Sequence, residues 1–221
     1  PLATLHHPHP HLWELEMHNG PKNILTPFFM TVCLLKALNI VERDWRSQHG
    51  VASGGPGALV ISGKRDQEQY FSAGKSYCRA ELSKLYPYIA SFAPALVRLL
   101  TFPMPTIAAL NGHTFGAGFA LALCCDYRIM QTSNGWCGMG EIFAGTSLGS
   151  IFSAILQCKL PSVLLKRSIP LEGRKFKAKE MHDLGVVDVM AENGGAAIEA
   201  ARQLALERAD LARTGVWGIN K

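Results

Sequence analysis

Short apolar runs of strand length alternate along this chain with segments of helical periodicity. The runs at 58–63 (ALVISG) and 105–110 (PTIAAL) show no apolar–polar alternation, which is typical of strands covered on both faces of a parallel sheet. Further strands are expected at 12–18, 126–130 and 185–190. This alternation of strand and helix predicts an α/β domain with mostly parallel strands.

Helical segments are expected between these strands. Thr26 and Pro27 open one of them, because a capping residue precedes a proline at the first helical position. Two or three shorter helices are expected within 77–102, where Pro87 and Pro94 interrupt the apolar pattern. Other helices are predicted at 148–156, 178–184 and 196–212.

Composition excludes several classes of protein. The 221 residues carry a net charge of +5, but the cations are scattered and form no basic stripe with aromatic residues. This argues against a nucleic-acid interface. No apolar run reaches the roughly 18–20 residues of a membrane span. The six cysteines form no C-x-x-C pair, which predicts reduced thiols in an intracellular protein.

The N-terminal run HHPHPH, residues 6–11, resembles a metal-binding tract in composition alone. Prolines interrupt it at positions 8 and 10. We therefore interpret it as a mobile chain end, and we expect no metal site in this protein.

Two glycine-containing turns follow predicted strands, one at Gly74 (FSAGKS) and one at Gly116 and Gly118 (GHTFGAG). Neither matches a dinucleotide-binding or phosphate-binding loop. Each turn could direct one backbone N–H at a single oxygen, and the helix after the second turn adds a partial positive charge at its N-terminus. Such a pair of donors forms an oxyanion hole. Close packing of helix on strand is the alternative explanation.

Glu141 is a candidate acid or base. It follows GWCGMG and precedes an apolar stretch. A carboxylate in apolar surroundings has a raised pKa and can exchange protons near neutral pH. A solvated glutamate at the edge of a loop is the alternative.

Taken in order, these blocks resemble the enoyl-CoA hydratase/isomerase family, the crotonases. The blocks are ALVISG…YFSAGKS, PTIAALNGHTFGAGFALALCCDYRIM, MGEIFAGTSLG and LEGRKFKAKEMHDLGVVD. The resemblance implies an α/β fold, a crotonase-like spiral of ββα units over 1–158 followed by a C-terminal helical region over 159–221. It also implies an acyl-CoA thioester substrate, no cofactor beyond the coenzyme A of that substrate, and a homotrimer or hexamer.

The same resemblance assigns roles to individual residues. The two oxyanion donors are expected to be the backbone N–H groups of Lys75 and Ala117, and the catalytic carboxylate is expected to be Glu141. Further substrate contacts are expected from Ala73, Gly74, Tyr77, Gly116 and Gly118.

The number of carboxylates distinguishes the branches of the family. Hydratases carry a second glutamate at the position occupied here by Ala120. One carboxylate suffices to move a proton from the α-carbon to the γ-carbon of an enoyl thioester. The sequence is therefore most similar to delta-3,delta-2-enoyl-CoA isomerases. Two alternatives stay open: a hydratase or other crotonase chemistry that uses a second group, and a catalytically silent acyl-CoA-binding homologue.

Some positions depart from the family pattern. The first turn reads Gly-Lys-Ser-Tyr where relatives have Gly-x-Asp-Leu, and GTSLGS follows Glu141 where relatives have a GLPLP-like stretch. His113 could assist catalysis, although a packed side chain is expected there. Relatives continue beyond Lys221, so we expect a truncated or divergent C-terminus. The resemblance implies a peroxisomal or mitochondrial protein, and no targeting signal is visible in the sequence.

Overall fold

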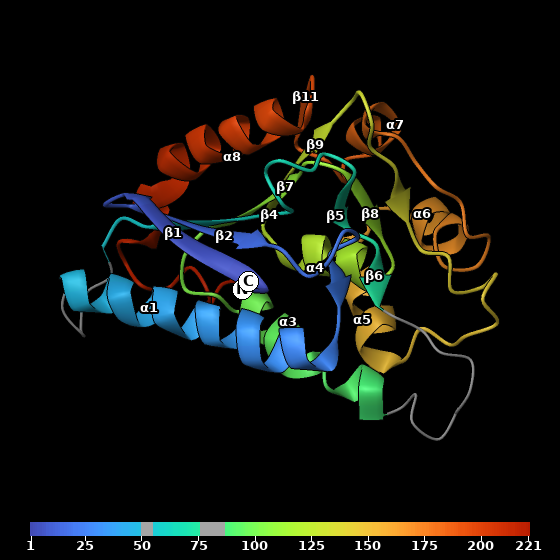
Figure 1. Cartoon of the computed structure of the whole chain (residues 1–221), viewed down its shortest axis with the longest axis horizontal. Coiled ribbons are helices and arrows are strands. Elements are labelled where there is room, and N and C mark those ends of the chain that lie inside the picture. Colours follow the sequence, from blue (N-terminus) through green and yellow to red (C-terminus); the bar gives the residue numbers. More distant parts are fainter. Residues whose placement is uncertain (50–54, 76–86) are drawn as a thin grey trace.

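The computed structural model describes residues 1–49, 55–75 and 87–221 (Figure 1). Its central feature is a six-stranded sheet in the order β1-β2-β4-β7-β9-β11. These strands are β1 Ala3–His9, β2 Leu12–Met17, β4 Ala58–Ser62, β7 Thr106–Leu110, β9 Tyr127–Gln131 and β11 Val189–Ala191. Strand β1 is antiparallel to β2, and the other neighbours are parallel. The predicted α/β class with mostly parallel strands is confirmed.

The strands β2, β4 and β7 are buried on both faces, which explains the continuous apolar runs of β4 and β7. In β4, Leu59 and Ile61 belong to the larger core cluster, whereas Val60 faces the other way and packs in a second cluster with Ile107 and Ala201. Helix α8 (Gly194–Arg208) covers this second face. Figure 1 shows α8 on one side of the sheet and helix α1 (Leu35–His49) on the other.

Two smaller sheets lie beside the large one. Strands β5 (Tyr70–Ser72), β8 (His113–Phe115) and β10 (Cys137–Gly138) form a parallel three-stranded sheet with β8 in the middle. Strands β3 (Ile24–Leu25) and β6 (Gly74–Lys75) pair with each other. Strands β5, β8 and β10 follow β4, β7 and β9 in the chain. Each turn of the spiral therefore contributes one strand to the six-stranded sheet and one to the three-stranded sheet. This confirms the predicted crotonase-like spiral.

The remaining helices complete the repeating units. Helix α3 (Ala93–Leu100) follows β5 and β6, α4 (Ala117–Cys124) follows β8, and α5 (Ser150–Lys159) follows β10. The C-terminal part adds α6 (Val163–Ser168), α7 (Ala178–Asp183) and the 3₁₀ helix η2 (Ala209–Ala212). None of the described helices combines the length and hydropathy needed to cross a membrane.

The helix predicted to open at Thr26 does so. The Thr26 hydroxyl accepts a hydrogen bond from Phe29 N at 3.1 Å, and a π-helical segment η1 (Phe29–Leu34) leads into α1. The division predicted at residue 158 falls within α5 and stays a prediction. Strand β11 and helix α8, which lie beyond that division, both pack with the central sheet.

Two sequence-based expectations were wrong. Residues 6–9 are no mobile end, because they belong to β1, and the His7 ring stacks on Trp13 with centroids 4.4 Å apart. Pro8 is tolerated because β1 is an edge strand whose pairing register shifts between His6 and His9. The strand expected at 185–190 is shorter and later, since Gly185 adopts φ +72° in the turn that ends α7. Helix α6 was not predicted.

Most of the described cysteines are buried or half-buried, as the apolar pattern suggested, and Cys78 lies outside the described residues. Cys124, Cys125 and Cys137 are buried, Cys33 is half-buried and Cys158 is exposed, and these five described cysteines are free thiols. Burial raises the pKa of the Cys125 thiol to about 12. Within the described ranges, no cluster of three or more His, Cys, Asp or Glu side chains is arranged to hold a metal ion.

Candidate active site

Three loops meet at one edge of the small parallel sheet. Strands β5, β8 and β10 run in the same direction, so their carboxyl ends lie side by side. The first loop, after β5, includes the two-residue strand β6 (Gly74–Lys75), and the second, after β8, carries Gly116 and leads into α4 at Ala117. The third, after β10, carries Glu141. Strand pairing therefore brings together segments that lie far apart in the sequence.

The first two loops touch through their backbones. A Cβ atom on Gly74 would lie 2.6 Å from the Phe115 carbonyl oxygen and 3.0 Å from the Ala117 nitrogen. Gly74 also has φ +88°, a conformation that side chains other than glycine rarely adopt. Both constraints require glycine at this position, and together they place the first loop against the start of α4.

The third loop brings its carboxylate to the second. A Cβ atom on Gly116, whose φ is +54°, would lie 2.9 Å from Glu141 Oε1. The backbone carbonyl of Glu141 accepts hydrogen bonds from the Ala144 and Thr146 amides, each at 3.1 Å. These two hydrogen bonds hold the turn that follows Glu141 against the backbone of Glu141 itself.

Gly118 has a different surrounding from the other glycines. A Cβ atom there would lie 2.6 Å from Ser72 Cβ. The Ser72 hydroxyl donates to the Asn23 carbonyl at 2.6 Å and accepts from the Gly74 amide at 3.1 Å. Gly118 therefore allows α4 to pack closely on β5, and through Ser72 this packing supports the first loop.

A cavity of about 180 Å³ opens between the three loops. Its lining residues are Ala73, Lys75, Phe115, Gly116, Gly140, Glu141, Ala144 and Thr146. Four residues predicted for the site are among them: Ala73, Lys75, Gly116 and Glu141. Gly74 and Ala117 are not among the lining residues, although each is a sequence neighbour of one and the two lie against each other, and Gly118 packs on β5. Tyr77 lies outside the described residues.

Two ionisable side chains that belong to the lining residues each have a buried polar atom. Lys75 Nζ and Glu141 Oε2 are both buried, and neither has a hydrogen-bond partner among the described residues. Burial lowers the pKa of the Lys75 ammonium, while the nearby Glu141 carboxylate favours its charged form. Sequence reasoning assigned a role only to the backbone of Lys75 and missed its side chain. The available signal was a long cationic residue within a turn already placed at the site.

The cavity contains a single carboxylate in its described lining, that of Glu141. Ala120, where hydratases carry a second glutamate, is fully buried within α4. His113 packs between the rings of Tyr70 and Phe115, with centroids 5.3 and 5.6 Å away. These contacts agree with the packed histidine that the sequence suggested.

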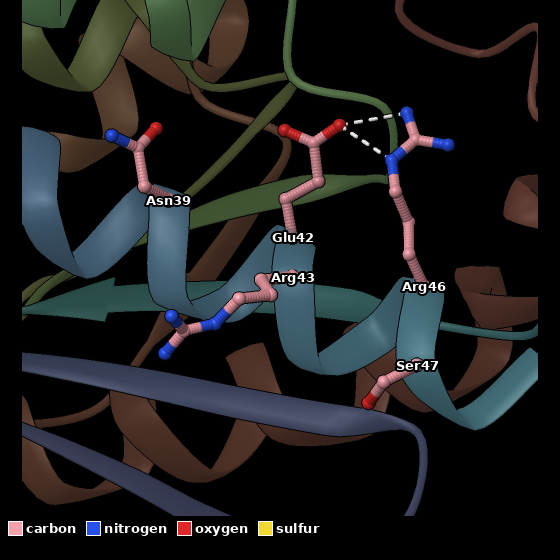
Figure 2. A pocket seen from close by; sticks show the side chains of 5 residues that line it. All are labelled: Asn39, Glu42, Arg43, Arg46 and Ser47. Carbon is pink, nitrogen blue, oxygen red and sulfur yellow. Dashed lines mark hydrogen bonds and ion pairs between the residues drawn. The ribbon is translucent and has the colours of Figure 1, made fainter. Parts of the chain in front are cut away.

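A larger hollow of about 440 Å³ lies on the outer face of α1. Figure 2 shows its lining residues, Asn39, Glu42, Arg43, Arg46 and Ser47, and the bonds between Glu42 and Arg46. Glu42 also pairs with Arg98, which donates to Asn39 Oδ1 at 3.4 Å. The Glu42 carboxylate is therefore satisfied within the chain, whereas Lys75 Nζ and Glu141 Oε2 have no hydrogen-bond partner in the described part of the structure.

The spiral and its loops define a crotonase fold. A solved enoyl-CoA hydratase from Mycobacterium ulcerans superposes with a TM-score of 0.79 at 22% identity, covering 96% of this chain and 86% of that protein. The profile of the family described as enoyl-CoA hydratase/isomerase matches residues 17–214, so the chain belongs to this family.

Individual relatives fall into both branches of the family. The chain is 40% identical to "Enoyl-CoA delta isomerase 2, peroxisomal" of Arabidopsis thaliana over 49% of this chain and 45% of the relative. It is 32% identical to "Putative enoyl-CoA hydratase" of Thermus thermophilus over 88% of this chain and 73% of the relative. The chain spans about half the length of the Arabidopsis isomerases that it matches.

Proposed function

We propose that this protein is an enoyl-CoA isomerase that converts 3-enoyl-CoA thioesters to 2-enoyl-CoA thioesters. The observation that carries the proposal is the carboxylate of Glu141, the single one in the described lining of the cavity beside the two glycine turns, with its Oε2 atom buried. The similarity to delta isomerases supports the same branch.

In the proposed reaction, Glu141 removes a proton from the α-carbon of the bound thioester. The electron pair of the broken C–H bond moves toward the thioester carbonyl and yields a dienolate. The backbone N–H groups of Lys75 and Ala117 stabilise the negative oxygen, assisted by the positive end of the α4 dipole. The protonated Glu141 then delivers a proton to the γ-carbon, which moves the double bond and regenerates the carboxylate. Coenzyme A takes part only as the thioester portion of the substrate.

The branch is tested by supplying purified protein with 3-enoyl-CoA and, separately, with 2-enoyl-CoA in water. We expect the first to be isomerised and the second to remain unhydrated. Glu141→Gln should lower kcat by about 10²–10⁴-fold, because the proton carrier is lost. Its affinity for acyl-CoA should stay within a few-fold of the wild type.

Glu207→Gln is a matched control, since Glu207 is exposed on α8. It should retain wild-type turnover. Full activity of Glu141→Gln would remove Glu141 from the mechanism. Hydration of 2-enoyl-CoA would favour the second candidate, a hydratase, to which the Thermus relative points. Acyl-CoA binding without either reaction would favour a catalytically silent homologue.

The family context extends the proposal to assembly and location. A homotrimer or a hexamer is proposed, together with a role in fatty-acid β-oxidation. A peroxisomal or mitochondrial location is proposed because the names of relatives include "peroxisomal" and "mitochondrial". Sedimentation of the purified chain tests the assembly, with a monomer contradicting it.

A further inference from the structure

The Ser72 hydroxyl is hydrogen-bonded to the first glycine turn. Ser72 is the last residue of β5 and is fully buried. Its hydroxyl donates to the Asn23 carbonyl at 2.6 Å and accepts from the Gly74 amide at 3.1 Å. One side chain therefore connects the residue that precedes β3 with the turn that carries the Lys75 amide.

Helix α4 packs against the same side chain. A Cβ atom on Gly118 would lie 2.6 Å from Ser72 Cβ and 2.8 Å from Ser72 Oγ. Because glycine has no side chain, α4 comes into contact with Ser72 at this point. Such close packing restricts the rotamers open to Ser72 and keeps its hydroxyl between its two partners.

The carbonyl that accepts from Ser72 belongs to a residue in an uncommon backbone conformation. Asn23 has φ +45°, the single positive φ of a non-glycine residue within the described ranges, and it is 2% exposed. Asparagine tolerates this left-handed region better than most residues. A strained conformation persists where the surrounding structure fixes it. The Asn23 carbonyl is therefore a firm point of attachment for the Ser72 hydroxyl.

The orientation of the Lys75 amide depends on Gly74, the residue before it. Gly74 has φ +88° and, as a glycine, few steric limits of its own. Three contacts limit it instead: the hydrogen bond to Ser72, the pairing of β3 with β6, and the close approach to the Ala117 nitrogen. The hydrogen bond to Ser72 is the one of these three that a side chain makes. A substitution can therefore remove it while both backbone contacts remain.

We propose that Ser72 is a positioning residue, whose hydroxyl fixes the Gly74–Lys75 peptide and so directs the Lys75 N–H at the thioester oxygen. This inference rests on the proposed function, since it takes the Lys75 amide as one of the two oxyanion donors. Ser72 is not among the residues that line the cavity, so it acts through the turn. Donors stabilise a transition state best when they are oriented before the reaction begins. Loss of the hydroxyl should therefore slow turnover more than it weakens substrate binding.

The test compares Ser72→Ala and Ser72→Cys with the wild type in two measurements. The first is the steady-state kinetics of 3-enoyl-CoA isomerisation. The second is difference infrared spectroscopy of bound hexanoyl-CoA, isotope-labelled at the thioester carbonyl, whose stretching frequency falls when amides donate hydrogen bonds to it. Ser168→Ala is the matched control, because the buried Ser168 hydroxyl also donates to a backbone carbonyl, that of Leu164 at 2.7 Å.

We expect Ser72→Ala to lower kcat about 10–100-fold, less than the 10²–10³-fold typical of a deleted oxyanion donor, because the amide is misdirected and not removed. KM should stay within about threefold of the wild type, since the lost interaction acts mainly in the transition state. The carbonyl shift on binding should become smaller in the same variant. Ser72→Cys should give intermediate values, because a thiol is a weaker donor and acceptor than a hydroxyl. Ser168→Ala should match the wild type in both measurements.

A folded Ser72→Ala protein with an unchanged carbonyl shift would overturn the inference, whether or not kcat falls, and would leave the isomerase proposal intact. If Ser72→Ala does not fold, Ser72→Cys decides by the same two measurements. A carbonyl shift that depends on Ser72, in a protein that isomerises nothing, would overturn the proposed reaction and leave the positioning role standing. Absence of any shift in the wild type would overturn both the oxyanion hole and the role of Ser72.

Discussion

At the scale of single residues, backbone conformation and close contacts between the loops determine which substitutions the site tolerates. Gly74 and Gly116 combine positive φ angles with contacts that a Cβ would violate, and Gly116 lies against the Glu141 carboxylate. Ala117 follows as the first residue of α4 and is buried. Its proposed role depends on its backbone amide and not on its side chain.

Replacing Ala117 with proline tests this amide directly. Proline is tolerated at the first helical position but carries no N–H. If the amide stabilises the dienolate, kcat on 3-enoyl-CoA should fall about 10²–10³-fold, or roughly 3–4 kcal/mol of barrier. Ala117→Ser keeps the amide and should stay near wild type. A folded Ala117→Pro protein with an unchanged rate would exclude this donor.

At the scale of elements, strand β8 contributes residues that pack at the site. Its first residue, His113, accepts a hydrogen bond at Nδ1 from the Trp136 amide at 3.3 Å and stacks near Phe115, which lines the cavity. Burial, and secondarily the charge of Lys175, lower the pKa of His113. Protonation would add a charge to a packed ring and remove the acceptor at Nδ1.

This arrangement predicts a pH-dependent contribution to stability. Because the folded-state pKa lies below the ordinary value of about 6.5, the unfolded chain binds the proton first as pH falls. The free energy of unfolding should therefore decrease on acidification from pH 7 toward the lowered pKa. His113→Gln should lose this component, as urea titrations between pH 5 and 8 would measure. Parallel pH profiles for the two proteins would contradict the prediction.

At the scale of the whole molecule, one buried carboxylate joins the two ends of the chain. Glu14 in β2 is 2% exposed and pairs with Arg65 and with Arg202 of α8, whose Nε lies 2.6 Å from Glu14 Oε1. The hydrogen bond to Glu14 is the main cause that raises the pKa of Arg202. An N-terminal strand and the C-terminal helix thus share one ion-pair network.

Removing Arg202 should loosen this connection. Arg202→Met is expected to lower the free energy of unfolding by about 2 kcal/mol, because the buried Glu14 loses charge-assisted hydrogen bonds. Arg213→Met is the control: its ion pair with Asp210 is exposed, so its loss should cost less than about 1 kcal/mol. Denaturant titration of both variants measures the difference. Equal, small losses would show that Arg65 alone satisfies Glu14.

Local sequence patterns predicted the elements whose environment, or whose capping residue, is written in their own sequence. The continuous run of β4 is apolar because both of its faces are covered, and the helix after Thr26 carries its own cap. Prediction failed where neighbours override local preference. Strand β1 forms despite Pro8 because β2 offers it a partner, and Gly185 delays β11 by extending the turn after α7.

The sequence by itself determined the alternating layers, the two glycine turns and the presence of one candidate carboxylate, because each depends on short-range periodicity or on the conformational freedom of glycine. Only the tertiary structure decided that these loops meet, since the pairing of β5, β8 and β10 joins residues from 70 to 138. It also separated Gly118, which packs on Ser72, from Gly116, which faces Glu141. The burial of Lys75 Nζ, with no hydrogen-bond partner among the described residues, arises in the same way, because it depends on the neighbouring elements.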